Sequence, residues 1–339
     1  MTKQNTRIIK KEKRKGIRNL IFAREAGVFF ALILMCIFLS IFTEVFLGVR
    51  NLLNVGRQVS LLGIMAAGMT FILITGEIDL SIGSTYAISG IITGMLLIKQ
   101  YNLYFSIFVG LAIGVLIGFL NGFISTYGKL PSFITTLGMM SVVRGSALLI
   151  TEGEPVAVNE LSGANPIAVN KFYFLGQGRL FDVIPMQLIF LIIISIVGWL
   201  LLSKTVFGFK VYAVGGNKKA AHVSGIKVFN IKIWTFIILG FLSALSGILM
   251  VAFMPSTQGG RTGVGKELDV IAATVVGGAS LAGGEGTILG TILGCFIIGV
   301  LRNGLVLMGI SPFWQEFAIG AVIIFAVLID MWTRNHRRR

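Results

Sequence analysis

Long apolar stretches recur along almost the whole of this 339-residue chain. A helix needs about 20 apolar residues to cross the hydrocarbon core of a bilayer. Only 13% of the residues are charged, whereas a soluble domain carries roughly 25%. We therefore predict an all-α integral membrane protein with about ten transmembrane helices, over residues 28–47, 59–75, 82–98, 104–126, 131–150, 185–202, 233–253, 268–282, 287–301 and 313–331.

The basic residues predict how the chain is oriented. The formal net charge is +15, and Lys and Arg gather in residues 3–24, 204–232 and 334–339, each beside an apolar stretch. Short cytoplasmic loops carry such an excess of Lys and Arg. Ten crossings place all three basic segments on the cytoplasmic side. We predict a multi-pass protein of the plasma (inner) membrane with both termini cytoplasmic, rather than a nucleic-acid-binding protein.

No linker divides the apolar part of the chain, so we expect one transmembrane domain over residues 28–332. A basic cytoplasmic segment, residues 1–27, precedes it, and a basic tail, residues 333–339, follows it. The loop at 203–232 holds six lysines and no acidic residue, which predicts a cytoplasmic position. The polar stretch at 151–184 is expected on the opposite side.

A short motif occurs twice. The sequence IGFLNG at 117–122 resembles IGVLRNG at 298–304, and the two apolar stretches that contain them have opposite predicted orientations. This pattern is typical of an inverted-topology repeat, here of helices 2–5 and 7–10. Chance similarity among glycine-rich apolar segments is the alternative. Such repeats often place a translocation path between the two halves.

The sequence lacks the common signatures of an enzyme. It contains no GxxxxGK[ST], HExxH or GxSxG motif. His222 and His336 lie in basic segments, and Cys36 and Cys295 lie within apolar stretches. We expect no catalytic residue, no metal site and no cofactor bound by this chain itself.

The sequence GEIDLSIGS at 76–84 places polar residues between two apolar stretches. Carboxylates near lipid are costly and usually face a cavity or a partner, which makes Glu77, Asp79 and Ser81 candidates for a polar path. Asp79 or Ser81 could instead cap the helix that follows. The two roles are compatible.

Two other segments carry polar or small residues in unusual density. Residues 268–286 are rich in Gly, Ala and Ser, which predicts either close helix packing or a broken helix beside a path. Residues 214–226 predict a short amphipathic helix within the lysine-rich loop, capped by Asn217 and ended by Gly225. That helix is either simply solvated or presented to a cytoplasmic partner.

Four motifs in order carry a family resemblance. GEIDLSIGS at 76–84, NGFISTYGKLPSFITTLG at 121–138, YAVGGNKKAAHVSGIKV at 212–228 and GGASLAGGEGT at 277–287 resemble the permease subunit of the ribose-type ABC sugar importers. The resemblance covers nearly all of residues 50–332. It departs from the family at Lys218 and Lys219, where glutamates are common, and at Glu77, where glycine is frequent.

The resemblance implies a transport function with separate partners. Two permease copies, expected here as a homodimer, would form the pore in the lipid bilayer for a monosaccharide such as a ribose-like pentose. An extracytoplasmic sugar-binding protein would deliver the sugar, and an ABC ATPase subunit would hold ATP and Mg. The residues expected along the substrate path or gate are Glu77, Asp79, Ser81, Asn121, Phe133, Thr135, Gly278 and Ser280.

The loop at 203–232 would then be the ATPase-coupling loop. The small side chains of Ala220 and Ala221 would allow close approach of a partner. The residues expected in the coupling contact are Gly216, Asn217, Lys218, Ala220, Ala221, His222, Ser224 and Gly225.

Two rival functions remain open from the sequence. An ion-coupled secondary transporter of a small polar solute would use Glu77, Asp79 or Asp269 as its coupling carboxylate. A channel or membrane scaffold would need no energy source.

Overall fold

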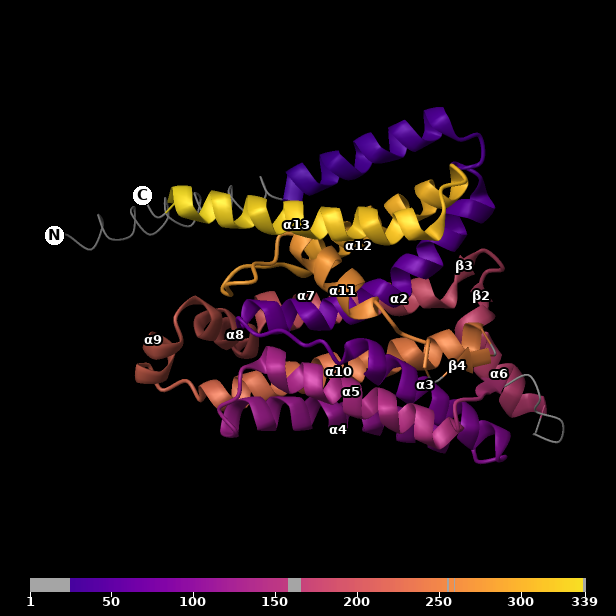
Figure 1. Cartoon of the computed structure of the whole chain (residues 1–339), viewed down its shortest axis with the longest axis horizontal. Coiled ribbons are helices and arrows are strands. Elements are labelled where there is room, and N and C mark those ends of the chain that lie inside the picture. Colours follow the sequence, from indigo (N-terminus) through magenta and orange to yellow (C-terminus); the bar gives the residue numbers. More distant parts are fainter. Residues whose placement is uncertain (1–24, 158–165, 255, 259, 338–339) are drawn as a thin grey trace.

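The computed structural model describes residues 25–157, 166–254, 256–258 and 260–337, and it is a bundle of helices (Figure 1). Most of the basic segment expected at residues 1–27 lies outside the described residues. Seven described helices are long and apolar enough to span a bilayer, which confirms the all-α integral membrane class. They are Glu25–Phe42, α2 (Val49–Ile74), α4 (Leu103–Tyr127), α5 (Ser132–Thr151), α7 (Met186–Lys204), α10 (Val228–Phe253) and α12 (Ile288–Leu307).

Shorter or less apolar helices complete the described bundle. They are α3 (Ile82–Ile98), α6 (Pro166–Gln177), α8 (Val206–Gly216), α9 (Lys218–Val223), α11 (Lys266–Val276) and α13 (Pro312–Arg337). Two small antiparallel pairs join β1 (Pro155–Ala157) to β4 (Ser256–Gln258) and β2 (Arg179–Leu180) to β3 (Ile184–Pro185).

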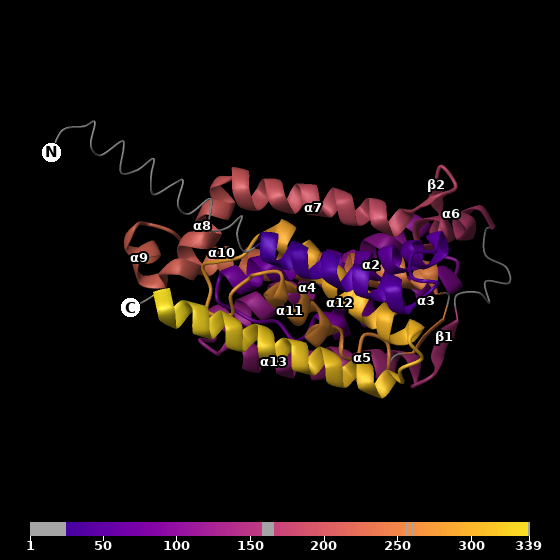
Figure 2. The same ribbon diagram turned by 90° about the horizontal axis from the view of Figure 1, so that it is seen from above.

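The bundle has two distinct ends. Helices α8 and α9 and the last turns of α13 lie at one end, which we call the α9 end (Figures 1 and 2). Helix α6 and strands β1 to β4 lie at the other, which we call the α6 end. The two polar connections expected on opposite sides of the membrane therefore lie at opposite ends of the bundle.

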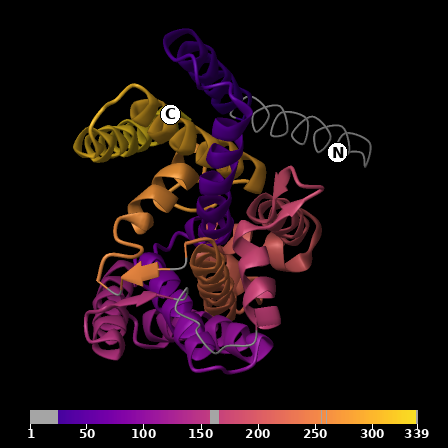
Figure 3. The same cartoon turned by 90° about the vertical axis from the view of Figure 1, so that its right-hand side faces the viewer.

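Helices α2 and α10 form the centre of the bundle. Helix α10 packs against α4, α3 and α2, and α12 packs against α2; Figure 3, viewed along the bundle, shows α10 enclosed by its neighbours. Small residues let membrane helices approach closely. Helix α4 has such a stripe, with glycines at every fourth position: Gly110, Gly114, Gly118 and Gly122.

The two copies of the repeated motif pack in a reciprocal way. A Cβ at Gly118 of α4 would overlap the carbonyl oxygen of Phe236 on α10, and a Cβ at Gly299 of α12 would overlap the side chain of Val59 on α2. Helices α2 and α10 begin the two halves of the predicted repeat. Each half therefore packs its motif-bearing helix against the first helix of the other half, an arrangement that fits inverted symmetry.

The expected eighth crossing differs from its prediction. Helix α11 has only 11 residues, or about 16 Å at 1.5 Å per residue, so it is too short to cross alone. The chain reaches it from β4 at the α6 end, and a Cβ at Gly83 of α3 would overlap the carbonyl oxygen of Gly263. This part of the chain thus combines a non-helical segment with a helix about half as long as a transmembrane helix. The prediction of a helix over 268–282 is wrong, because α11 ends at Val276.

Two further boundaries differ from expectation. The ninth helix, predicted over 287–301, is longer than expected, because α12 continues to Leu307 and includes Arg302, Asn303 and Gly304. The reciprocal amide pair between Asn303 and Asn51 of α2, at 2.8 and 3.0 Å, satisfies these polar side chains without breaking the helix. The lysine-rich loop forms two helices, α8 and α9, rather than one over 214–226.

Candidate functional site

The connection between α2 and α3 is non-helical, as its polar sequence predicts. Gly76 turns the chain with φ of +74°. The first turn of α5 then holds it: the Ile78 N–H donates to Ser132 Oγ at 3.2 Å, and the Leu80 N–H donates to Thr136 Oγ1 at 3.1 Å. These hydroxyls supply acceptors that lipid cannot provide. We call residues 76–81 the α2–α3 connection.

Asp79 lies in the most buried part of this connection. Its Oδ1 accepts from the backbone N–H and the hydroxyl of Ser81, both at 2.7 Å, and its Oδ2 accepts from Asn121 Nδ2 of α4 at 3.1 Å. Asn121 Nδ2 also donates to Ser81 Oγ at 2.8 Å. In the described part of the chain, Asp79 therefore closes a network of uncharged donors just before α3. The N-cap residue Ser81 makes no side-chain cap bond, and the only described backbone N–H that Asp79 accepts from is that of Ser81, so neither side chain caps α3 as the capping interpretation predicts.

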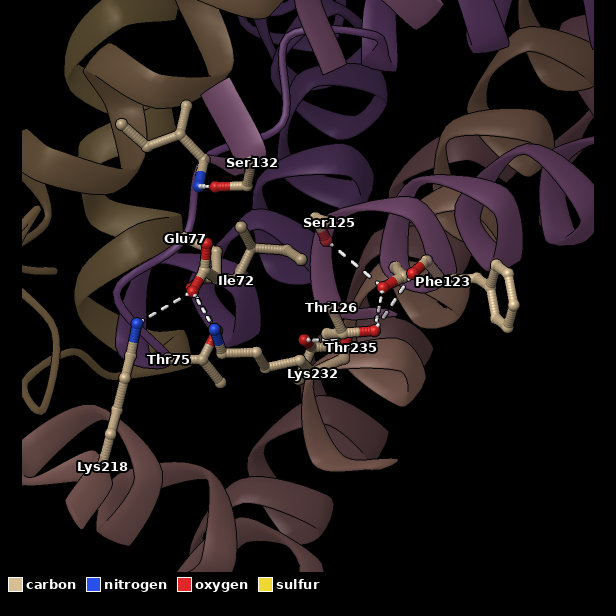
Figure 4. Close-up of polar contacts among 12 residues, drawn as sticks. Ile72, Thr75, Glu77, Phe123, Ser125, Thr126, Ser132, Lys218, Lys232 and Thr235 are labelled. Atoms are coloured by element: carbon tan, nitrogen blue, oxygen red, sulfur yellow. Dashed lines mark hydrogen bonds and ion pairs between the residues drawn. The ribbon is translucent and has the colours of Figure 1, made fainter. Parts of the chain in front are cut away.

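Glu77 lies at the α9 end of the same connection and is 8% exposed. Lys218 of α9 approaches its Oε1 at 3.0 Å, and Lys232 near the start of α10 contacts the same oxygen (Figure 4). Burial alone would raise the pKa of Glu77, but hydrogen bonds from Lys232, Ser132 and Lys218 outweigh it and hold the pKa below its usual value. The ionised Glu77 carboxylate therefore stabilises the fold at neutral pH, and this stabilisation is lost as the pH falls through the lowered pKa.

The second half of the chain repeats this arrangement with charged partners. Asp269 follows Glu267 on α11 at the spacing by which Asp79 follows Glu77. Its Oδ1 accepts from Arg302 of α12 at 3.1 Å, and Lys266 approaches its Oδ2 at 3.6 Å. Arg302 occupies the place in its motif that Asn121 occupies in the first copy.

A cavity of about 390 Å³ borders Asp269 and Arg302. Arg57, Tyr86 and Phe253 also line it, so it combines a few polar groups with apolar and aromatic walls. No group of three His, Cys, Asp or Glu side chains able to hold a metal ion occurs within the described ranges.

The glycine-rich stretch at 277–286 packs against the α2–α3 connection. A Cβ at Gly283 would lie 3.1 Å from the Cα of Gly76, and the Gly284 N–H donates at 2.8 Å to the carbonyl of Ile74, the last residue of α2. Ser280 is fully buried, and its N–H donates to the Glu285 carbonyl at 3.0 Å. Gly278 has φ of +96°, a conformation that permits the sharp turn after α11. The two segments expected to share a path therefore touch, although through backbone at the α9 end.

Phe133 and Thr135 separate on α5. Thr135 is buried, and its hydroxyl has no hydrogen-bond partner among the described residues. Phe133 is 47% exposed, whereas Asp79 is 2% exposed. The structure thus brings Glu77, Asp79, Ser81 and Asn121 together and leaves Phe133 on an outer face.

Helix α9 forms the exposed tip of the lysine-rich loop. Asn217 caps it by accepting from the Ala220 N–H at 3.0 Å, and Gly225 with φ of +81° ends it, as predicted. Val223 is 88% exposed. The other exposed residues here are Gly216, Lys218, Lys219, Ala220, His222 and Ser224.

The expectation that Ala221 faces a partner is wrong. Its side chain is 4% exposed and belongs to the hydrophobic core of this chain. The helical spacing explains the difference, because only one face of so short a helix can pack on the bundle. Ala220, one residue earlier, is on the exposed face.

Sequence reasoning missed several residues that hold the α2–α3 connection. Ser132, Thr136 and Lys232 all contact it, yet they lie more than 50 residues away in sequence. The helix predicted over 131–150 includes Ser132 and Thr136, but its apolar pattern does not indicate which segment their hydroxyls contact. The pairing of Lys218 with Glu77 joins two positions at which this chain departs from the pattern it resembles, and that joint departure was the available signal.

Comparison with known proteins gives matches along nearly the full chain. A family model described as branched-chain amino acid transport system, permease component, matches residues 51–327. The ribose import permease protein RbsC of Bacillus subtilis (strain 168) is 42% identical over 307 residues, which is 91% of this chain and 92% of that protein. RbsC of Escherichia coli (strain K12) is 39% identical over 300 residues, covering 88% and 91% respectively.

A relative named for a different sugar matches over a similar length. The L-arabinose ABC transporter permease protein AraH of Azospirillum brasilense is 35% identical over 329 residues, covering 96% of this chain and 92% of that protein. No solved structure matches the chain.

Proposed function

The chain belongs to the permease-component family of branched-chain amino acid transport systems, and from this membership we propose that it is the membrane subunit of an ATP-driven ABC importer of a monosaccharide. The observation that carries the proposal is the 42% identity with a ribose import permease over more than nine-tenths of both chains. The names of the relatives refer to ribose and L-arabinose. Both are pentoses, which makes a pentose the substrate class we expect.

We infer that an ABC ATPase docks at the α9 end, which lies in the cytoplasm, and that this ATPase holds ATP and Mg. The exposed face of α9 supports this, because it presents an apolar side chain, Val223, beside the exposed residues Ala220 and His222. Contact with a separate ATPase is required, since the sequence has no P-loop of its own.

The opposite α6 end would then meet the extracytoplasmic binding protein, and a second copy of the chain would complete the pore.

Cysteines introduced at Asn217 and at Asp182, both exposed, test the orientation. Membrane-impermeant labelling from opposite sides of the plasma membrane is expected. Labelling of both from one side would refute it.

Transport in liposomes tests the function. The chain is reconstituted with its ATPase, and ATP is supplied on the side of the membrane where the α9 end lies. Labelled ribose and the binding protein are supplied on the side of the α6 end. We expect uptake that requires ATP, the ATPase and the binding protein together. Uptake driven by an ion gradient without the ATPase would overturn the proposal.

One observation favours the ion-coupled alternative. Asp79 is 2% exposed, and its contacts in the described ranges are to hydroxyl, amide and backbone groups rather than to cations. A buried carboxylate of this kind serves as a coupling site in secondary transporters. Glu77 and Asp269, in contrast, are each paired with cations. Loss of gradient-driven uptake in Asp79→Asn would support the alternative.

A further inference from the structure

Glu77 joins three parts of the molecule that are separate in sequence. Its carboxylate contacts Lys218 on the exposed helix α9 and Lys232 near the start of the central helix α10. Its own backbone belongs to the α2–α3 connection, whose next residues hydrogen-bond to Ser132 and Thr136 of α5. Figure 4 shows the two lysines converging on one carboxylate oxygen.

The two ion pairs of Glu77 differ in their exposure to solvent. The Lys218 side chain is 49% exposed, whereas those of Glu77 and Lys232 are 10% and 15% exposed. Charge-assisted hydrogen bonds strengthen as solvent is excluded. The inner pair thus ties the connection to α10, and the outer pair ties it to a helix that reaches into solvent.

The segment beyond Glu77 is able to pass on a displacement. Non-helical backbone of this kind has no hydrogen-bond ladder of its own, so its geometry depends on the side chains that hold it. Two residues further on, Asp79 binds Asn121 of α4 at 3.1 Å. Movement of Glu77 therefore acts on the starts of α3 and α5 and on the C-terminal part of α4.

We propose that Glu77 is a positioning residue for transport, which passes motion of α9 to the α2–α3 connection and α5 through its ion pair with Lys218. The proposal rests on the proposed function, because it assumes that an ATPase moves α9. It predicts that the pair sets how much sugar is moved per ATP, rather than whether the chain folds or binds its ATPase.

Charge reversal separates this role from docking. Lys218→Glu places an acid against Glu77, whereas Lys219→Glu makes the same change of charge at the neighbouring exposed residue of α9. We expect Lys218→Glu to lower the sugar transported per ATP hydrolysed about tenfold, equivalent to about 1.4 kcal/mol. Lys219→Glu is expected to leave that ratio within about twofold of the wild-type value.

The swapped pair is the decisive variant. Glu77→Lys combined with Lys218→Glu restores opposite charges between the α2–α3 connection and α9, in the reverse order. We expect the ratio to recover to within about threefold of wild type, or about 0.65 kcal/mol, while Glu77→Lys alone remains as low as Lys218→Glu. Melting temperature and ATPase co-purification are measured for every variant.

The outcomes distinguish two kinds of failure. Equal losses in Lys218→Glu and Lys219→Glu, no recovery in the swapped pair, or an unchanged ratio with a lower melting temperature would each overturn the role of Glu77. Absence of ATP-dependent uptake by the wild-type complex would instead overturn the proposed function.

Discussion

Asp79→Ala is expected to destabilise the chain at the start of α3. The carboxylate of Asp79 accepts three hydrogen bonds, two from Ser81 and one from Asn121, in a site that is 2% exposed. A buried donor left without an acceptor costs about 1–3 kcal/mol. Alanine leaves three hydrogen-bond donors without this acceptor, although Asn121 keeps its bond to Ser81. We therefore expect the free energy of unfolding to fall by about 3 kcal/mol.

Asp79→Asn provides the matched control. The Asn side chain keeps one oxygen for Ser81, and its nitrogen would face Nδ2 of Asn121. A flip of the Asn121 amide would bring its Oδ1 into place, an atom that has no partner among the described residues. The flip gives up the 2.8 Å bond from Asn121 to Ser81. We therefore expect Asp79→Asn to cost about 1 kcal/mol, close to one neutral hydrogen bond.

The assay is the melting temperature of the detergent-purified protein, followed by size-exclusion chromatography after heating. A loss of about 3 kcal/mol lowers the melting temperature of a large domain by roughly 6–12 °C. The double variant Asp79→Asn with Asn121→Asp exchanges donor and acceptor and should recover part of the loss. If Asp79→Ala melted within a degree of wild type, the network would not be what holds α3.

Three other changes test separate features. Among the described residues, Arg302→Met leaves the Asp269 carboxylate with only the more distant cation Lys266, and it should lower the free energy of unfolding by about 2 kcal/mol, because the pair is partly exposed. Asp269→Asn in the Arg302→Met background should recover most of that loss. Gly83→Ala should abolish the yield of monodisperse protein because its Cβ overlaps backbone, whereas Gly138→Ala, with open space around it, should leave the yield unchanged. Val223→Asp should leave membrane insertion intact and prevent co-purification of the ATPase, because it places a charge on the apolar tip of α9.

The apolar pattern predicted most of the fold because lipid constrains it strongly. A stretch of about 20 apolar residues in a bilayer has few options other than a helix, and the described helices confirm that class. The resemblance to ribose-type permeases is likewise confirmed by the 42% and 39% identity with two ribose import permeases, together with the family match over residues 51–327. Charge asymmetry predicted which connections share an end of the bundle, and the side of the membrane on which each lies stays a prediction.

The unpredicted parts are those governed by contacts between distant segments. Hydropathy cannot distinguish α11 from a full crossing, because the glycines after Val276 are apolar too. The same limit applies to Asp269, whose partner Arg302 is 33 residues away on another helix. The orientation of Ala221 depends on how α9 rests on the bundle, which is a tertiary property.

The grouping of the candidate path residues in space was predicted in part. The residues Glu77, Asp79 and Ser81 lie within five consecutive positions of the sequence, so their proximity to one another was foreseeable. Asn121 joins them because α4 crosses α3 with its glycine stripe turned toward α10, which sequence periodicity alone does not specify. The role of these residues in transport stays a prediction.

The reciprocal packing of the two halves has a consequence for biosynthesis. A chain is made from its N-terminus, and α3 and α4 enter the membrane long before α10, the helix against which the Gly118 face of α4 is closed. Likewise, Asn51 of α2 can form its hydrogen bond with Asn303 only after α12 has been inserted. Until then, the nascent first half exposes a glycine-lined face to lipid or to insertion factors, and the Asn51 Oδ1 lacks its donor from Asn303, although Asn51 Nδ2 can already donate to the Phe46 carbonyl. Truncated chains that end before α10 should therefore be retained by the insertion machinery or degraded, rather than accumulate as a stable half-protein.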